Sequence, residues 1–115
     1  MDKPCILFVD DDQEILAAYA RALRKQYRVE TAAGPVVGLE RLATLPDVAV
    51  VVSDLRMPGM DGVEFLGRVR ELRPEAVRII LTGFADIGVA MAAINTSKIF
   101  SFLTKPCSKT DLEET

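Results

Sequence analysis

The chain contains no histidine and no tryptophan among its 115 residues, and it contains only two cysteines. The absence of histidine excludes hydrolases that use a histidine base, and it excludes the common zinc sites, which rely on imidazole ligands. Any chemistry of this chain that needs an imidazole group must therefore take it from another protein.

The sequence also lacks a large net charge and a long apolar run. Its formal net charge is −3, whereas domains that bind nucleic acid directly carry a basic face. Half of the residues are hydrophobic, yet no run approaches the roughly 20 residues that cross a membrane. No secretory leader precedes the first predicted strand. We therefore expect a cytoplasmic domain that binds neither nucleic acid nor a membrane.

The two cysteines are predicted to lie at opposite ends of a sheet. Cys5 opens the first predicted strand and Cys107 follows the last one, which places them about 17 Å apart, the length of a short strand. A disulfide requires Cα atoms within about 7 Å of each other. Two free thiols are expected, as in a cytosolic protein.

Predicted strands and helices alternate along the chain. Apolar periodicity predicts strands at 5–9, 27–31, 48–54, 77–81 and 99–103, and helices at 13–25, from Gly34-Pro35 onward, at 63–72 and at 86–95. The predicted inward-facing residues are Ile15, Leu16, Tyr19, Leu23, Leu39, Leu42, Phe65, Leu66, Val69 and Leu72. Such alternation with short connections predicts one α/β domain over residues 1–115, with a parallel sheet covered on both faces.

Polar side chains follow four of these strands. Asp54 ends a valine-rich run that is typical of a strand buried on both faces. Asp10-Asp11-Asp12, Thr82 and Lys105 stand at the ends of three other strands. Because open α/β sheets bind ligands at the carboxyl ends of their strands, these groups are expected to converge. Acids, a hydroxyl and a lysine together indicate a metal-assisted phosphoryl site.

Four motifs occur in the order found in one protein family. They are Phe8-Val9-Asp10-Asp11, Asp54 before Met57-Pro58-Gly59-Met60-Asp61-Gly62, Leu81-Thr82-Gly83, and Phe102-Leu103-Thr104-Lys105-Pro106. Together they resemble the receiver domain of two-component response regulators, from Cys5 to about Asp111. The resemblance implies a three-layer flavodoxin-like fold with a five-stranded parallel sheet in the order 2-1-3-4-5.

The resemblance also implies roles for the acids. Asp54 would be the nucleophile that takes a phosphoryl group from a histidine kinase or phosphotransfer protein as an aspartyl phosphate. Asp11 and Asp54 would bind Mg²⁺ directly, Asp10 mostly through water, and the backbone carbonyl of Arg56 would complete the protein ligands. Asp12 is interpreted as a helix cap, which contributes ~1 kcal/mol.

Residues from the later strands would complete the site. The Lys105 ammonium would offset the charge of the phosphoryl oxygens, while Thr82 and Phe102 would form a conformational switch. Phe102 is equally consistent with a plain core residue. Many receivers carry a tyrosine at this position, so Phe102 can pack but cannot donate a hydroxyl hydrogen bond. Arg56 and Phe84 would line access to the phosphoryl group. Such a domain is no conventional enzyme, since it catalyses only its own phosphorylation and slow dephosphorylation.

The last part of the chain bears on what the domain controls. Residues 92–106 resemble receivers fused to HD-type cyclic-dinucleotide phosphodiesterases or to hydrogenase-type transcription activators, which is analogy alone. Residues 108–115 look like the truncated start of a fifth helix, too short to be stable unaided. We therefore expect the N-terminal part of a longer regulator. An uncovered apolar groove would favour pairing of two copies as a homodimer.

Three other classes of protein compete with this interpretation. Asp10-Asp11-Asp12 contains the D-x-D of haloacid dehalogenase-type hydrolases, but these need a further acidic pair, and only Asp111, Glu113 and Glu114 occur late in the chain. A phosphorylation-independent interaction module usually loses an acid, the threonine or the lysine, and this chain keeps them all. A flavodoxin-like cofactor domain would need a glycine- or Ser/Thr-rich phosphate loop after the first strand.

Overall fold

The computed structural model describes residues 3–82, 88, 91 and 101–104. The strands are β1 (Cys5–Asp10), β2 (Arg28–Ala33), β3 (Val48–Asp54), β4 (Val77–Thr82) and β5 (Ser101–Thr104). The helices are α1 (Gln13–Leu23), α2 (Pro35–Thr44) and α3 (Gly62–Leu72). The predicted helix at 86–95 and the truncated fifth helix lie outside the described residues, except that Gly88 and Met91 are helical.

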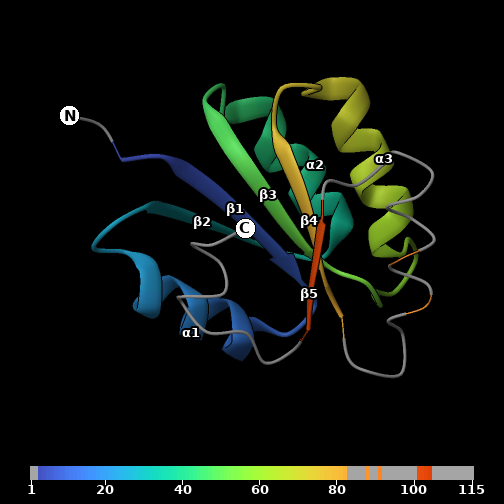
Figure 1. The fold of residues 1–115 in the computed structure, drawn as a ribbon, viewed down its shortest axis with the longest axis horizontal. Coiled ribbons are helices and arrows are strands. Elements are labelled where there is room, and N and C mark those ends of the chain that lie inside the picture. The colour runs from blue at the N-terminus through green and yellow to red at the C-terminus, as the bar shows by residue number, and fades with distance from the viewer. Residues whose placement is uncertain (1–2, 83–87, 89–90, 92–100, 105–115) are drawn as a thin grey trace.

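The five strands form one parallel sheet in the order β2-β1-β3-β4-β5. This order confirms the predicted flavodoxin-like arrangement. Helix α1 covers one face of the sheet, and α2 and α3 cover the other (Figure 1). Because all strands run in the same direction, their carboxyl ends meet at a single edge, where β1 delivers Asp10 and β3 delivers Asp54.

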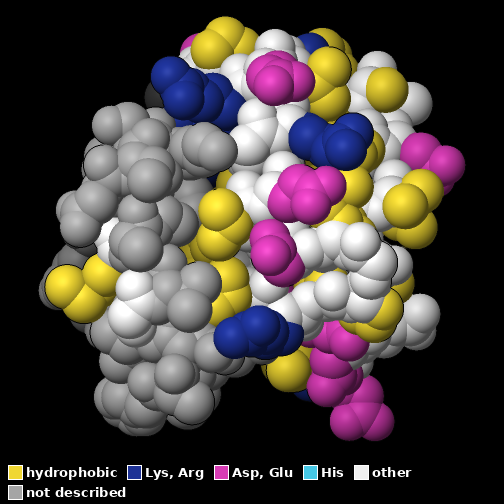
Figure 2. All heavy atoms as spheres, turned by 90° about the vertical axis from the view of Figure 1, so that its right-hand side faces the viewer, with side chains coloured by type: hydrophobic (Ala, Val, Ile, Leu, Met, Phe, Trp, Pro, Cys, Tyr) yellow, Lys and Arg dark blue, Asp and Glu magenta, His cyan; other side chains and the backbone are white. Residues whose placement is uncertain are grey.

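The surface on the α3 side has no continuous apolar patch in its described part. Figure 2 shows basic and acidic side chains interspersed with scattered hydrophobic ones on this side. Along α3, exposed charges of both signs occur, and the Arg68 guanidinium lies 3.5 Å from the Glu64 carboxylate one turn away. Such an exposed pair contributes little to stability, and this face is a solvated helix surface. No described helix is long and apolar enough to cross a membrane.

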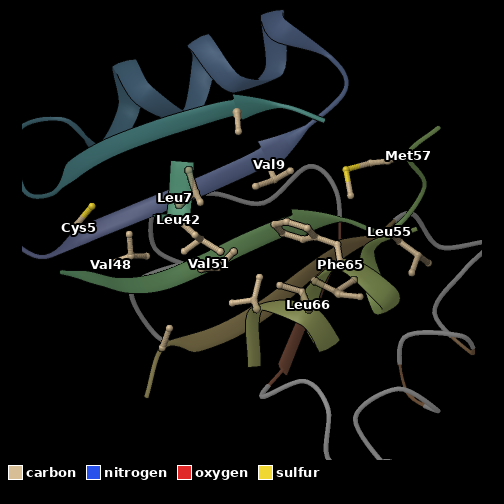
Figure 3. Packing of buried hydrophobic residues seen from close by; sticks show 14 residues of the cluster. Cys5, Leu7, Val9, Leu42, Val48, Val51, Leu55, Met57, Phe65 and Leu66 are labelled. Atoms are coloured by element: carbon tan, nitrogen blue, oxygen red, sulfur yellow. The ribbon is translucent and has the colours of Figure 1, made fainter. Parts of the chain in front are cut away.

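Two apolar layers enclose the sheet, because successive residues of a strand point to opposite faces. On the α2–α3 side, Figure 3 shows Leu7, Val9, Val51 and Phe65 directed into one cluster. The layer beneath α1 consists of Ile6, Phe8, Leu16, Leu23, Val52, Ile79 and Leu81. Tyr19 packs against this second layer, with its ring stacked on Phe8 at 5.0 Å between centroids.

Most of the predicted core residues are buried, but the prediction that Leu72 faces the core is wrong. Its side chain is 54% exposed, although it continues the spacing of Phe65 and Val69. The helix ends at this residue, the chain turns at Arg73, and Ala76 is buried in the cluster instead. Periodicity alone could not show that the covered length of α3 ends one turn earlier.

Several boundaries differ from the sequence prediction by one residue, and those at the ends of β2 and α1 differ by two. Strand β2 continues to Ala33, two residues beyond the predicted end, because pairing with β1 extends it through residues of low strand propensity. Helix α1 ends at Leu23, where Arg24 is the C-cap, rather than at Lys25. Helix α2 begins at Pro35 after Gly34, as predicted.

Candidate functional site

Three carboxylates meet at the carboxyl edge of the sheet. Asp10 ends β1, Asp11 follows it, and Asp54 ends the neighbouring strand β3. One oxygen from each of the three lies within 4.8 Å of the others. Asp10 and Asp54 are buried, at 3% and 9% exposure, whereas Asp11 is exposed. The structure therefore brings together the three acids that strand-end placement predicted.

Asp10 is oriented by the loop that enters α1. Its Oδ1 accepts a hydrogen bond of 2.9 Å from the backbone N–H of Asp12, and its carbonyl accepts one of 3.1 Å from Gly34. Asp12 has a different task, because its Oδ1 accepts from the N–H groups of Glu14 and Ile15. The prediction that Asp12 caps the helix is confirmed.

Asp54 is fixed through its own main chain and that of its neighbours. It pairs with Leu81 across the β3–β4 ladder, and the following N–H, of Leu55, donates to the Leu81 carbonyl at 3.1 Å. The Ser53 hydroxyl donates to the Asp54 carbonyl at 2.9 Å. From the sequence, Ser53 was interpreted only as one residue of the buried strand that ends at Asp54. A hydroxyl within such a run must find a partner, and this was the signal for its role.

The turn after Asp54 brings the chain back to the carboxyl end of β3. Gly59 has φ +84°, a conformation that glycine adopts without strain. Asp61 then caps α3 by accepting from the Glu64 N–H at 2.8 Å, and the Gly62 N–H donates to the Leu55 carbonyl at 2.8 Å. The motif from Met57 to Gly62 is thus a closed turn that packs the start of α3 against the end of β3.

Acidic side chains have different neighbours at different places on the described surface. Glu30 forms an ion pair with Arg41, and Asp47 forms one with Arg28, which lowers the pKa of the Asp47 carboxyl below its usual value. At the carboxyl edge of the sheet, the three site acids lie beside one another. Like charges at this spacing repel each other. The clustering of these acids therefore does not by itself stabilise the folded protein. Oxygen-rich, negatively charged groups of this kind fit a hard divalent cation such as Mg²⁺.

The remaining predicted residues are placed only in part. Thr82 is the last residue of β4 and pairs with Thr104, and Phe102 lies in β5 opposite Ile80. Both therefore occupy the predicted strand positions near the same edge of the sheet. Lys105 and Phe84 lie outside the described residues, and Arg56 is exposed two residues after Asp54.

Comparison with known proteins agrees with this geometry. The model of the response regulator receiver domain family matches residues 6–115. The hydrogenase transcriptional regulatory protein HoxA of Cupriavidus necator is 39% identical over 101 residues, which is 88% of this chain and 21% of HoxA. The chain thus spans about a fifth of the length of that relative.

Solved structures show the same likeness. A response regulator receiver domain protein from Clostridium thermocellum is 30% identical, with a TM-score of 0.90 over 96% of this chain and 89% of that one. The signal receiver domain of an HD domain-containing protein from Pseudomonas fluorescens Pf-5 is 32% identical, with a TM-score of 0.87 over 99% and 84%. Both kinds of relative expected from residues 92–106 are therefore among the similar proteins.

Proposed function

This chain belongs to the response regulator receiver domain family, and from that premise we propose that Asp54 accepts a phosphoryl group from a phosphohistidine of a histidine kinase or phosphotransfer protein. The observation that carries the proposal is the cluster that the buried Asp54 forms with the buried Asp10 and the exposed Asp11. An Asp54 oxygen would form a bond to phosphorus while the phosphorus–nitrogen bond of the donor breaks. The donor nitrogen would keep the electron pair of that bond.

The acids of this edge would hold Mg²⁺. Side-chain oxygens of Asp10, Asp11 and Asp54, with the backbone carbonyl of Arg56, supply the kind of ligand that this ion prefers. When bound, Mg²⁺ would offset the negative charge on the phosphoryl oxygens. The hydrogen bond from the Asp12 N–H keeps Asp10 directed to the site, and the ladder to β4 holds the main chain of Asp54.

The later strands would sense phosphorylation. Lys105 would bind a phosphoryl oxygen, the Thr82 hydroxyl would donate to another, and Phe102 would change position as the loop after β4 moves inward. Residues 1–115 would then be the cytoplasmic receiver of a longer regulator. Since HoxA is named as a transcriptional regulator and another relative as an HD domain-containing protein, the attached output domain would be of one of these kinds.

Treatment of the protein with acetyl phosphate tests the proposal directly. With Mg²⁺ present, the intact mass should increase by one phosphoryl group, and hydroxylamine should remove that group, as it does from acyl phosphates. With EDTA in place of Mg²⁺, no increase is expected. Absence of any increase with Mg²⁺ would instead favour a phosphorylation-independent interaction module.

Asp11→Ala and Asp12→Ala form a matched pair that tests the division of roles. Asp11→Ala should weaken Mg²⁺ binding by more than tenfold, about 1.4 kcal/mol, because it removes a ligand. Asp12→Ala should leave Mg²⁺ affinity nearly unchanged but lower the free energy of unfolding by ~1 kcal/mol, because it removes the cap of α1. Magnesium titration followed by amide NMR and urea denaturation measure the two quantities. A larger loss of Mg²⁺ affinity in Asp12→Ala would contradict the assignment.

A further inference from the structure

Gly62, the first residue of α3, lies directly against the main chain of Asp54. It is buried, and a Cβ atom added to it would stand 2.3 Å from the Asp54 carbonyl oxygen and 3.0 Å from the Leu55 Cα atom. Side chains do not approach backbone atoms so closely. Any residue larger than glycine must therefore move either the end of β3 or the start of α3.

The other glycines of the described part do not have this relation to the site. Gly59 has positive φ and open space around it, so its conformation explains the residue. Gly67 also faces open space. A Cβ on Gly38 would meet the Phe65 ring at 2.9 Å, which is a core side chain and not the main chain of the site. Only Gly62, among these glycines, would press on the backbone of the proposed phosphoacceptor.

The main chain of Asp54 has little freedom to yield. Its carbonyl already accepts the hydrogen bond from the Ser53 hydroxyl. On one side, the Leu55 N–H is bound to the Leu81 carbonyl of β4. On the other, the Leu55 carbonyl accepts from the Gly62 N–H. Pressure from a side chain at position 62 would thus pass to the Cα atom of Asp54 and shift its carboxylate.

We propose that Gly62 is a positioning residue, whose lack of a side chain sets the Asp54 carboxylate at its working distance from Asp10 and Asp11. The inference rests on the proposed function of Asp54 and adds a residue that acts through it. Metal and catalytic groups must be held within about 0.5 Å of their productive geometry. Relief of a 2.3 Å contact to ordinary van der Waals distance needs a larger movement than that.

Three variants of α3 separate positioning from loss of stability. Gly62→Ala adds the methyl group beside Asp54. Gly67→Ala makes the same change in the same helix where the space is open. Val69→Ala removes two methyl groups from a fully buried side chain farther along α3, which lowers stability by leaving a cavity. For each variant, the Mg²⁺ dissociation constant is measured from backbone amide shifts, and the rate of phosphoryl uptake from acetyl phosphate is measured per folded molecule.

Gly62→Ala should weaken Mg²⁺ binding by about 10- to 100-fold, the usual effect of disturbing the groups that orient metal ligands, and it should slow phosphoryl uptake. Gly67→Ala and Val69→Ala should bind Mg²⁺ as the wild type does. The inference is overturned if folded Gly62→Ala binds Mg²⁺ with wild-type affinity, or if Val69→Ala weakens binding equally. If the wild type takes up no phosphoryl group but Gly62→Ala still binds Mg²⁺ more weakly than the wild type, the proposed function is refuted and the positioning role of Gly62 is not.

A second variant covers the case in which Gly62→Ala does not fold. Asp61→Ala removes the cap of α3 (2.8 Å to the Glu64 N–H) and loosens the first turn without adding bulk near Asp54. It should weaken Mg²⁺ binding more than Val69→Ala does, and Asp61→Ser, which keeps a capping oxygen, should restore it. Wild-type Mg²⁺ affinity in Asp61→Ala would then overturn the inference.

Discussion

Asp54→Asn should abolish phosphoryl uptake from acetyl phosphate while leaving the protein folded. The asparagine amide has nearly the shape of the carboxylate but is not a nucleophile towards phosphorus. Stability should be kept or should rise without metal, because one of three neighbouring negative charges is removed. Intact mass after treatment with acetyl phosphate and Mg²⁺, together with urea denaturation, measures both effects.

Asp12→Asn is the control for this substitution. It makes the same chemical change on a nearby acid that caps α1, and asparagine is an equally good cap. It should therefore take up a phosphoryl group as the wild type does. If Asp54→Asn gained a full phosphoryl group, the assignment of the phosphoacceptor would be wrong.

Phe65→Ala should lower the free energy of unfolding by about 3–5 kcal/mol, the usual cost of deleting a buried phenylalanine ring. Phe65 is completely buried in the layer between the sheet and α2–α3. Its ring fills the space that the absent side chain of Gly38 leaves against α2. Since domains are stable by only about 5–15 kcal/mol, this variant should be close to unfolding, and urea denaturation measures the loss.

Two substitutions serve as references for Phe65→Ala. Phe65→Leu keeps most of the apolar volume and should cost much less. Val36→Ala shortens a side chain that is 64% exposed, so its effect should lie within about 0.5 kcal/mol. Equal stability of Phe65→Ala and Val36→Ala would show that the α2–α3 layer does not hold the domain together.

The three site acids could be predicted because their position depends on a local pattern. Asp54 follows a buried valine-rich run, Asp10 and Asp11 follow another, and the carboxyl ends of parallel strands must meet at one edge. The strand order could not be predicted from a local pattern. Apolar periodicity does not specify which strands are neighbours, and the order confirmed by the structure was predicted only through the resemblance to receiver domains.

Features that depend on distant contacts could not be predicted in the same way. The approach of Gly62 to the Asp54 carbonyl arises from the packing of α3 on β3, and a glycine in a turn motif suggests only conformational freedom. The exposure of Leu72 depends on where α3 ends relative to the cluster that it covers. Both are tertiary effects, which helical spacing does not determine.

The most direct test of the account is to locate the phosphorylated residue in the wild-type protein. Borohydride reduction converts an aspartyl phosphate to homoserine, and peptide mass spectrometry then identifies the position. Homoserine is expected at Asp54, formed only after incubation with acetyl phosphate and Mg²⁺. Homoserine at Asp10 or Asp11, with Asp54 unchanged, would contradict this expectation and would favour a hydrolase of the haloacid dehalogenase type.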